Sequence, residues 1–160
     1  YYYITPELKY NLYIRNDPRK NVVPLTGYAV NKGIEFFQGN PIYISIDPEG
    51  LVGCEYGSVG ISNLASFLVE NQFKIKGAST DKEQAELNNV SYANCQYHPE
   101  GPVIILKGGN QTQIIYETAS CYIIEIANCK VLPAIEKFQV QMILDARERK
   151  TAQQSSGNLL

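Results

Sequence analysis

The stretch that decides the fold class runs from residue 103 to residue 126 and reads VIILKGGNQTQIIYETASCYIIEI. It contains three apolar runs rich in isoleucine and valine, at 103–106, 113–116 and 122–126, and such residues favour β-strands. Gly108, Gly109 and Asn110 separate the first two runs and tolerate the positive φ angles of a tight turn. The pattern predicts three consecutive antiparallel strands, a β-meander.

Further short strands are predicted on either side of this stretch. Residues 42–46 read IYISI and precede Asp47-Pro48-Glu49-Gly50, a composition typical of a type I turn, after which residues 51–56 would return as the next strand. Residues 10–15 alternate apolar and polar side chains, as in a half-buried strand. With about eight such strands and one or two short helices, near 62–68 and 81–88, we expect a mainly β, antiparallel sandwich.

Residues 135–146 fit two structures. Apolar and polar residues alternate from 138 to 145 with only Ile143 out of step, which favours a strand. A helix would have to place Gln139 on its apolar face, although Pro133 suits a helix start and glutamine and methionine favour helices. The alternative fold is therefore an α+β domain with a helix at 135–146 packed on one face of the sheet.

The chain has 160 residues, the size of one domain, which we place at 1–150. Residues 1–15 form an extended aromatic segment of this domain, and residues 151–160 form a polar tail whose composition favours disorder. The net charge of −2 and the absence of a basic stripe argue against nucleic-acid binding. No run of 18 apolar residues exists, so no transmembrane segment is expected.

Cysteines and glycosylation sequons together predict a location outside the cytosol. An even number of cysteines suits a disulfide framework, and N-x-[ST] sequons matter only where glycans are transferred. The chain starts with tyrosine, which fits removal of a signal peptide before it reaches the exterior or the cell surface. The residues concerned are the cysteines Cys54, Cys95, Cys121 and Cys129 and the sequon asparagines Asn89 and Asn110.

The spacing of the cysteines limits how they pair. Cys121 and Cys129 flank a predicted strand, which would hold them about 25 Å apart, whereas a disulfide needs Cα atoms within about 7 Å. Two connectivities remain: 54–121 with 95–129, or 54–129 with 95–121. The second is favoured, because Cys95 and Cys121 each precede a strand and alternate strands of a meander run parallel.

No grouping of residues indicates catalysis, a metal site or a cofactor. His98 is the single histidine, and a cysteine-dependent enzyme would have to combine it with Cys95. Zinc sites usually contain close cysteine pairs such as C-x₂-C, which the chain lacks. We therefore expect no enzyme, no metal and no cofactor, and an enzyme built on Cys95 and His98 is the last of three hypotheses.

Tyrosines crowd the N-terminal segment, and their rigid, half-polar rings suit a surface buried against a partner. The leading hypothesis is a structural or assembly subunit of a filament, sheath or surface complex, in which residues 1–15 add a strand to a neighbouring subunit of a homo-oligomer or larger assembly. The second is a monomeric extracellular module whose tyrosines line a ligand or glycan site. The partner-binding residues would be Tyr1, Tyr2, Tyr3, Tyr10 and Tyr13.

Overall fold

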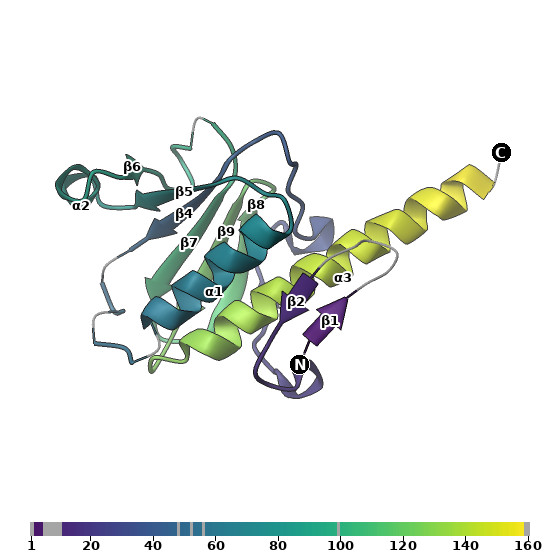
Figure 1. Ribbon diagram of the computed structural model, residues 1–160, viewed down its shortest axis with the longest axis horizontal. Helices are drawn as coiled ribbons and strands as arrows, with labels where there is room; N and C mark the ends of the chain where they lie inside the picture. The colour runs from purple at the N-terminus through teal and green to yellow at the C-terminus, as the bar shows by residue number, and fades with distance from the viewer. Residues whose placement is uncertain are drawn as a thin grey trace.

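The structure, a computed structural model, describes residues 2–4, 11–47, 49–51, 53–55, 57–98 and 100–158, with side chains from residue 11 to residue 153. Within these residues one mixed β-sheet contains seven strands: β3 (Leu25–Thr26), β4 (Ile42–Ile46), β5 (Ile75–Ser79), β6 (Ser91–Tyr92), β7 (Val103–Gly108), β8 (Gln113–Thr118) and β9 (Cys121–Ile126). Their order across the sheet is β3-β8-β9-β7-β4-β5-β6 (Figure 1).

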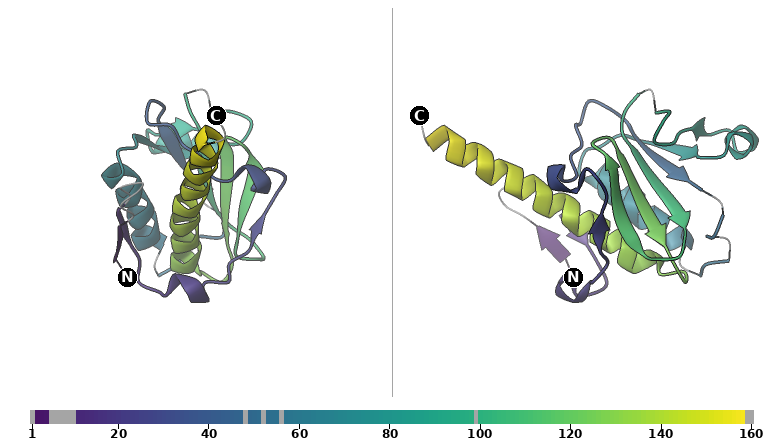
Figure 2. Two further views of the ribbon diagram at one scale, coloured as in Figure 1. Left: turned by 90° about the vertical axis from the view of Figure 1, so that its right-hand side faces the viewer. Right: turned by 180° about the vertical axis from the view of Figure 1, so that it is seen from behind.

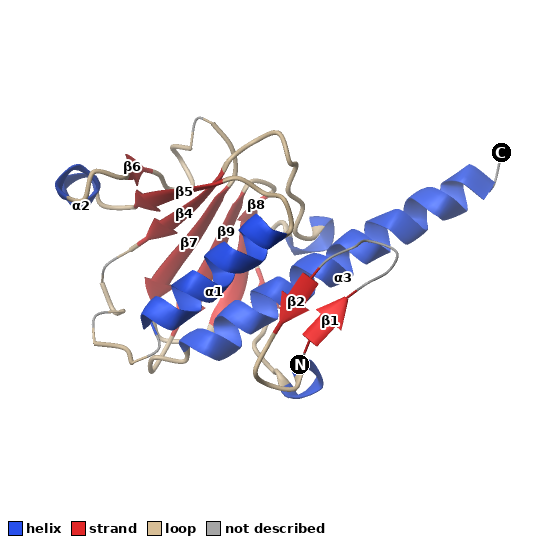
Figure 3. Ribbon diagram, in the orientation of Figure 1, coloured by secondary structure: helices blue, strands red, loops and turns tan. Residues whose placement is uncertain are grey.

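Most neighbouring strands of the sheet run parallel. The pairs β9–β7, β7–β4, β4–β5 and β5–β6 are parallel, β8 pairs antiparallel with β9, and β3 is parallel to β8. Helix α1 (Gly57–Glu70) connects β4 to its parallel neighbour β5. The prediction of a mainly β, antiparallel sandwich is therefore wrong, and the fold is an α/β-like domain (Figure 3).

Two long helices cover the same face of the sheet, as Figure 1 shows. They are α1 and α3 (Val131–Asn158), and a short helix α2 (Lys82–Leu87) lies between β5 and β6. Buried side chains of α1, α3 and this sheet face form the main hydrophobic core. At its centre Phe36 packs edge-on against Tyr122, with ring centroids 5.4 Å apart, and Tyr122 packs in the same way against Phe138.

The three strands predicted within residues 103–126 are confirmed as β7, β8 and β9, but their order in the sheet is not that of a meander. Strand β9 inserts between β8 and β7, because the link from β7 to β8 crosses the end of β9, where the Gly109 amide donates to the Ile126 carbonyl. Strand propensity does not encode this order. Residues 51–56, predicted as a strand, contain no strand where they are described. The chain then enters α1 five residues before the helix expected from Ser62.

Residues 135–146 are helical and belong to α3. Gln139, the polar residue that interrupts the helical pattern, is buried and hydrogen-bonded to another segment, and so is Asp145. Gln139 is 2% exposed and donates from Nε2 to the Asn63 carbonyl at 3.1 Å, and Asp145 accepts from the Ile34 amide at 2.8 Å. Leu144 is 42% exposed on the opposite face. The expected disordered tail is also helical, because residues 151–158 continue α3 beyond the sheet (Figure 2).

The N-terminal segment folds back on its own chain. Strand β1 (Tyr2–Ile4) pairs antiparallel with β2 (Asn11–Tyr13) in a separate two-stranded sheet. The side chain of Asn71, at the end of α1, bonds to the backbone of Asn11 in both directions, at 2.8 and 3.0 Å. Two 3₁₀ turns follow, η1 (Pro18–Lys20) and η2 (Val30–Lys32). This segment therefore packs against the helices of the same domain.

Two disulfides join Cys54 to Cys129 and Cys95 to Cys121, the second of the two connectivities left by the cysteine spacing. The Cα atoms are 5.2 and 5.3 Å apart. The preference for this pairing assumed that Cys95 and Cys121 precede two parallel strands. Strands β7 and β9 are parallel, but they are direct neighbours in the sheet and not alternate strands of a meander. Cys121 is buried in a smaller cluster on the sheet face opposite α1 and α3, together with Tyr43, Val103 and Ile105. Two disulfides are compatible with an extracellular location.

Candidate binding groove

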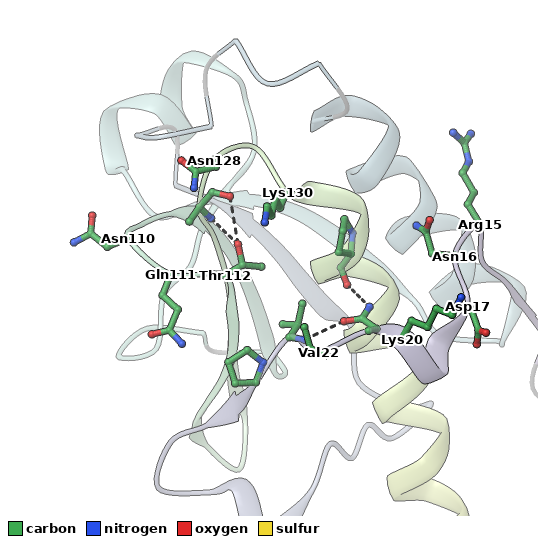
Figure 4. A pocket seen from close by; sticks show the side chains of 15 residues that line it. Arg15, Asn16, Asp17, Lys20, Val22, Asn110, Gln111, Thr112, Asn128 and Lys130 are labelled. Atoms are coloured by element: carbon green, nitrogen blue, oxygen red, sulfur yellow. Dashed lines mark hydrogen bonds between the residues drawn. The ribbon is translucent and has the colours of Figure 1, made fainter.

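A polar groove of about 950 Å³ opens between three segments that are distant in sequence (Figure 4). One wall is the N-terminal segment 15–24, which includes η1. The other wall combines the turn before β8, at 110–112, with the link from β9 to α3, at 127–130, and the first turn of α3. The groove is lined by Arg15, Asn16, Asp17, Lys20, Asn21, Val22, Val23, Pro24, Asn110, Gln111, Thr112, Ala127, Asn128, Lys130 and Pro133.

Glu136 on α3 holds the N-terminal wall in place. Its carboxylate is 4% exposed and accepts from the Arg15 amide at 2.7 Å and from Asn16 Nδ2 at 3.1 Å. Further along the wall, Asn21 donates from Nδ2 to the Pro133 carbonyl at 2.9 Å. A buried carboxylate must be hydrogen-bonded to be tolerated, so these contacts are strong anchors.

On the opposite wall, the link from β9 to α3 is held by hydrogen bonds between Thr112 and Ala127 and by the disulfide of Cys129. Thr112 Oγ1 accepts from the Ala127 amide at 3.0 Å, and its hydroxyl lies 3.3 Å from the Ala127 carbonyl. Asn128 and Cys129 both have left-handed backbones, with φ of 52° and 56°. Such conformations cost about 1 kcal/mol or more for residues other than glycine. The disulfide from Cys129 to Cys54 therefore secures a strained turn next to Lys130.

The groove carries an excess of positive charge. Arg15, Lys20 and Lys130 are exposed along its lining, and Asp17 is the one carboxylate there. Asp17 also accepts hydrogen bonds from Arg19 Nε at 3.0 Å and Nη2 at 2.9 Å, and these bonds lower its pKa below the ordinary value. Lys20 and Lys130 come from opposite walls (Figure 4). An acidic ligand would meet three cations and one carboxylate that Arg19 already neutralises.

The predicted glycosylation sites lie in different places. Asn110 is exposed on the rim of this groove. Asn89 is exposed on the turn between α2 and β6 and does not line the groove. The structure thus separates two sequons that looked alike in sequence.

Among the predicted partner-binding tyrosines, Tyr13 is the one whose side chain the structure describes, and it does not line the groove. Tyr2 and Tyr3 belong to β1, and Tyr13 in β2 is 69% exposed. Tyr1 and Tyr10 lie outside the described residues. The hypothesis that tyrosines form a ligand site therefore stays a prediction.

The proposed pairing of Cys95 with His98 does not produce a catalytic site. Cys95 is bonded to Cys121 and has no thiol to act as a nucleophile. His98 Nδ1 lies 2.9 Å from the Gly101 carbonyl, a local contact within the loop. Among the described residues, no three His, Cys, Asp or Glu side chains are grouped so that they could hold a metal ion. The same residues include no helix long and apolar enough to span a membrane.

Sequence reasoning missed the groove altogether. Arg15, Lys20 and Lys130 are ordinary surface residues in sequence, and none belongs to a recognisable motif. They meet only because Glu136 draws residues 15–16 onto α3, more than a hundred positions away. No local pattern could have indicated this.

Comparison of the chain with protein-family models, with curated proteins and with solved structures found no match.

Proposed function

We propose that the protein is a non-enzymatic, extracytoplasmic binding domain that holds an acidic oligosaccharide in the groove between residues 15–24 and the β9–α3 link. The observation that carries the proposal is the charge of the groove: its lining includes three basic residues, and Asp17, the one carboxylate in that lining, is neutralised by Arg19. The protein as a whole has a net charge of −2, so this positive charge is local.

The other lining residues favour a sugar over a simple anion. Asn110, Gln111 and Asn128 carry amides, which both donate and accept hydrogen bonds and so match the alternating needs of sugar hydroxyl groups. A volume of about 950 Å³ is at the upper end of the range for small-molecule sites, enough for several sugar units. Carboxylates of uronic acids would then pair with Lys20 and Lys130.

Calorimetric titration tests the proposal with an oligomer of galacturonic acid and, as the neutral counterpart, a maltooligosaccharide of the same length. We expect binding of the acidic oligomer only, and weaker binding as salt screens the exposed charges. Lys130→Ala should weaken it about two- to five-fold, the range for one exposed ion pair. Lys82→Ala removes another exposed lysine, on α2 and outside the groove, so it is the matched control and should change nothing.

Equal affinity for both oligosaccharides, or equal effects of the two lysine substitutions, would remove the proposal. Binding of a poly-glutamate peptide in preference to the uronic-acid oligomer would show instead that the groove recognises acidic protein segments.

A second candidate function is assembly through the N-terminal strand. The observation in its favour is that β1, within the described residues, pairs on one side only, with β2. An unpaired strand edge can accept a strand from another subunit. Deletion of residues 1–9 should then yield a folded monomer where the full chain forms oligomers, as measured by light scattering after gel filtration. Oligomers that survive the deletion would exclude this mode of assembly.

A further inference from the structure

The sheet face covered by α1 has an apolar groove at its β6 side. The groove measures about 410 Å³ and lies between α1 and the segment formed by α2 and β6. Its lining is mostly aliphatic and includes Ile44, Ile61, Ile75 and Val90. Parallel sheets normally have both faces buried under helices. Here α2 has only six residues, and no described helix covers this part of the sheet.

Two further features make this region a place where copies of the protein would associate. Leu87 is 77% exposed and Val90 is 38% exposed, on either side of Asn89. Strand β6 follows at once, and within the described residues it pairs only with β5, so one of its edges is open. Exposed apolar groups beside an open strand edge promote aggregation unless something covers them.

Asn89 lies on the turn after α2, between two residues that line this groove. Helix α2 ends in a Schellman motif, in which the Val90 amide donates to the Ala85 carbonyl at 3.0 Å and the Asn89 amide donates to the Glu86 carbonyl at 3.3 Å. Asn89 has the left-handed φ of 52° that this motif requires. Its side chain is exposed, and the residues before and after it, Asn88 and Val90, both line the groove.

We propose that Asn89 carries an N-linked glycan whose first sugars cover the apolar groove and block the open edge of β6. The sequon Asn89-Val90-Ser91 supplies the acceptor, with no proline at its middle position. A lipid-linked oligosaccharide pyrophosphate is the donor. The Asn89 amide nitrogen bonds to the anomeric carbon of the first sugar, the bond from that carbon to the pyrophosphate oxygen breaks, and the amide loses one proton. This inference does not depend on what the polar groove binds.

The test uses protein secreted from a eukaryotic host that glycosylates sequons. Ser91→Ala removes the sequon and leaves Asn89 in its Schellman position, and Asn89→Gly removes it with a residue that also accepts positive φ. Asn110→Gln removes the other sequon and is the matched control, because Asn110 borders the polar groove. Glycopeptide mass spectrometry reports occupancy, and light scattering after gel filtration reports the mass of the particle.

We expect a glycan on Asn89 of the wild-type protein. Ser91→Ala and Asn89→Gly should each at least double the mass of protein per particle in solution, whereas Asn110→Gln should leave it unchanged. Enzymatic release of the glycan from folded wild-type protein should cause the same association without any substitution in the gene. Adding Leu87→Lys to Ser91→Ala should return the protein to a monomer, since it places a charge on the apolar surface.

An unmodified Asn89 in the secreted protein would overturn the proposal. So would a protein that stays monomeric without this glycan. Association that Leu87→Lys fails to relieve would show that the contact lies elsewhere on the molecule, and would overturn the assigned role of the glycan.

Discussion

Replacing Glu136 with alanine tests how the N-terminal segment is attached to the domain. The Glu136 carboxylate accepts two charge-assisted hydrogen bonds, from the Arg15 amide at 2.7 Å and from Asn16 Nδ2 at 3.1 Å. Each such bond contributes about 1.5–3 kcal/mol net, a value that already includes the cost of burying the carboxylate. We therefore expect Glu136→Ala, which removes both bonds, to lower the free energy of unfolding by about 3–6 kcal/mol.

Glu136→Gln separates charge from shape. The glutamine keeps one oxygen to accept the Arg15 amide but loses the negative charge, so the free energy of unfolding should fall by only about 1 kcal/mol. Urea unfolding followed by circular dichroism gives both values by linear extrapolation. Because Arg15 and Asn16 form one wall of the polar groove, Glu136→Ala should also weaken binding of the uronic-acid oligomer more than Glu136→Gln does.

The reasoning fails if Glu136→Ala unfolds within about 0.5 kcal/mol of the wild-type protein, the scatter of ordinary surface substitutions. It also fails if alanine and glutamine have equal effects on stability, because the carboxylate charge would then contribute nothing.

Three further predictions concern the helix contact, the buried tyrosines and the disulfides. Gly60→Ala should lower the free energy of unfolding by about 1–2 kcal/mol in chemical denaturation, because the added Cβ would lie 2.3 Å from Val131 Cγ1. In the double variant with Val131→Ala, the free energy of unfolding should fall by less than the sum of the two single effects. Burial raises the pKa of Tyr116 above its ordinary value of 10.0, so the contribution of Tyr116 to stability is complete below pH 10 and is lost as the pH rises further. Alkaline titration of phenolate absorbance should therefore show a late step that coincides with unfolding, and complete titration of the folded protein near pH 10 would contradict this. Replacing both members of the Cys54–Cys129 disulfide with alanine opens a link across 75 residues and should cost about 4 kcal/mol in urea unfolding, a value that a loss below about 1 kcal/mol would refute.

The strands were the part of the fold that sequence could locate. The apolar runs at 42–46, 103–106, 113–116 and 122–126 all lie in strands, since β-branched residues favour extended backbone whatever the strand pairs with. The order of those strands was not accessible. It depends on the path of the link at 109–112 over the end of β9, which is a property of the folded sheet.

Helix α3 shows why periodicity failed where it did. Gln139 lies on its buried side, and a pattern that equates burial with apolar side chains therefore favours a strand; Asp145 is buried as well. Each is satisfied by a backbone group of a distant segment, the Asn63 carbonyl for Gln139 and the Ile34 amide for Asp145. Buried polar residues become predictable only when their hydrogen-bond partners are known.

By itself, the amino-acid sequence determined where four of the strands lie, where the sequons lie and which cysteine pairs were sterically possible. These properties follow from local conformational preference and from the limited reach of a few residues. Tertiary structure alone decided the parallel arrangement of the sheet, the fold-back of residues 11–16 onto α3 and the meeting of Arg15, Lys20 and Lys130 in one groove. Those features rest on contacts between segments far apart in sequence, whose partners no local pattern specifies.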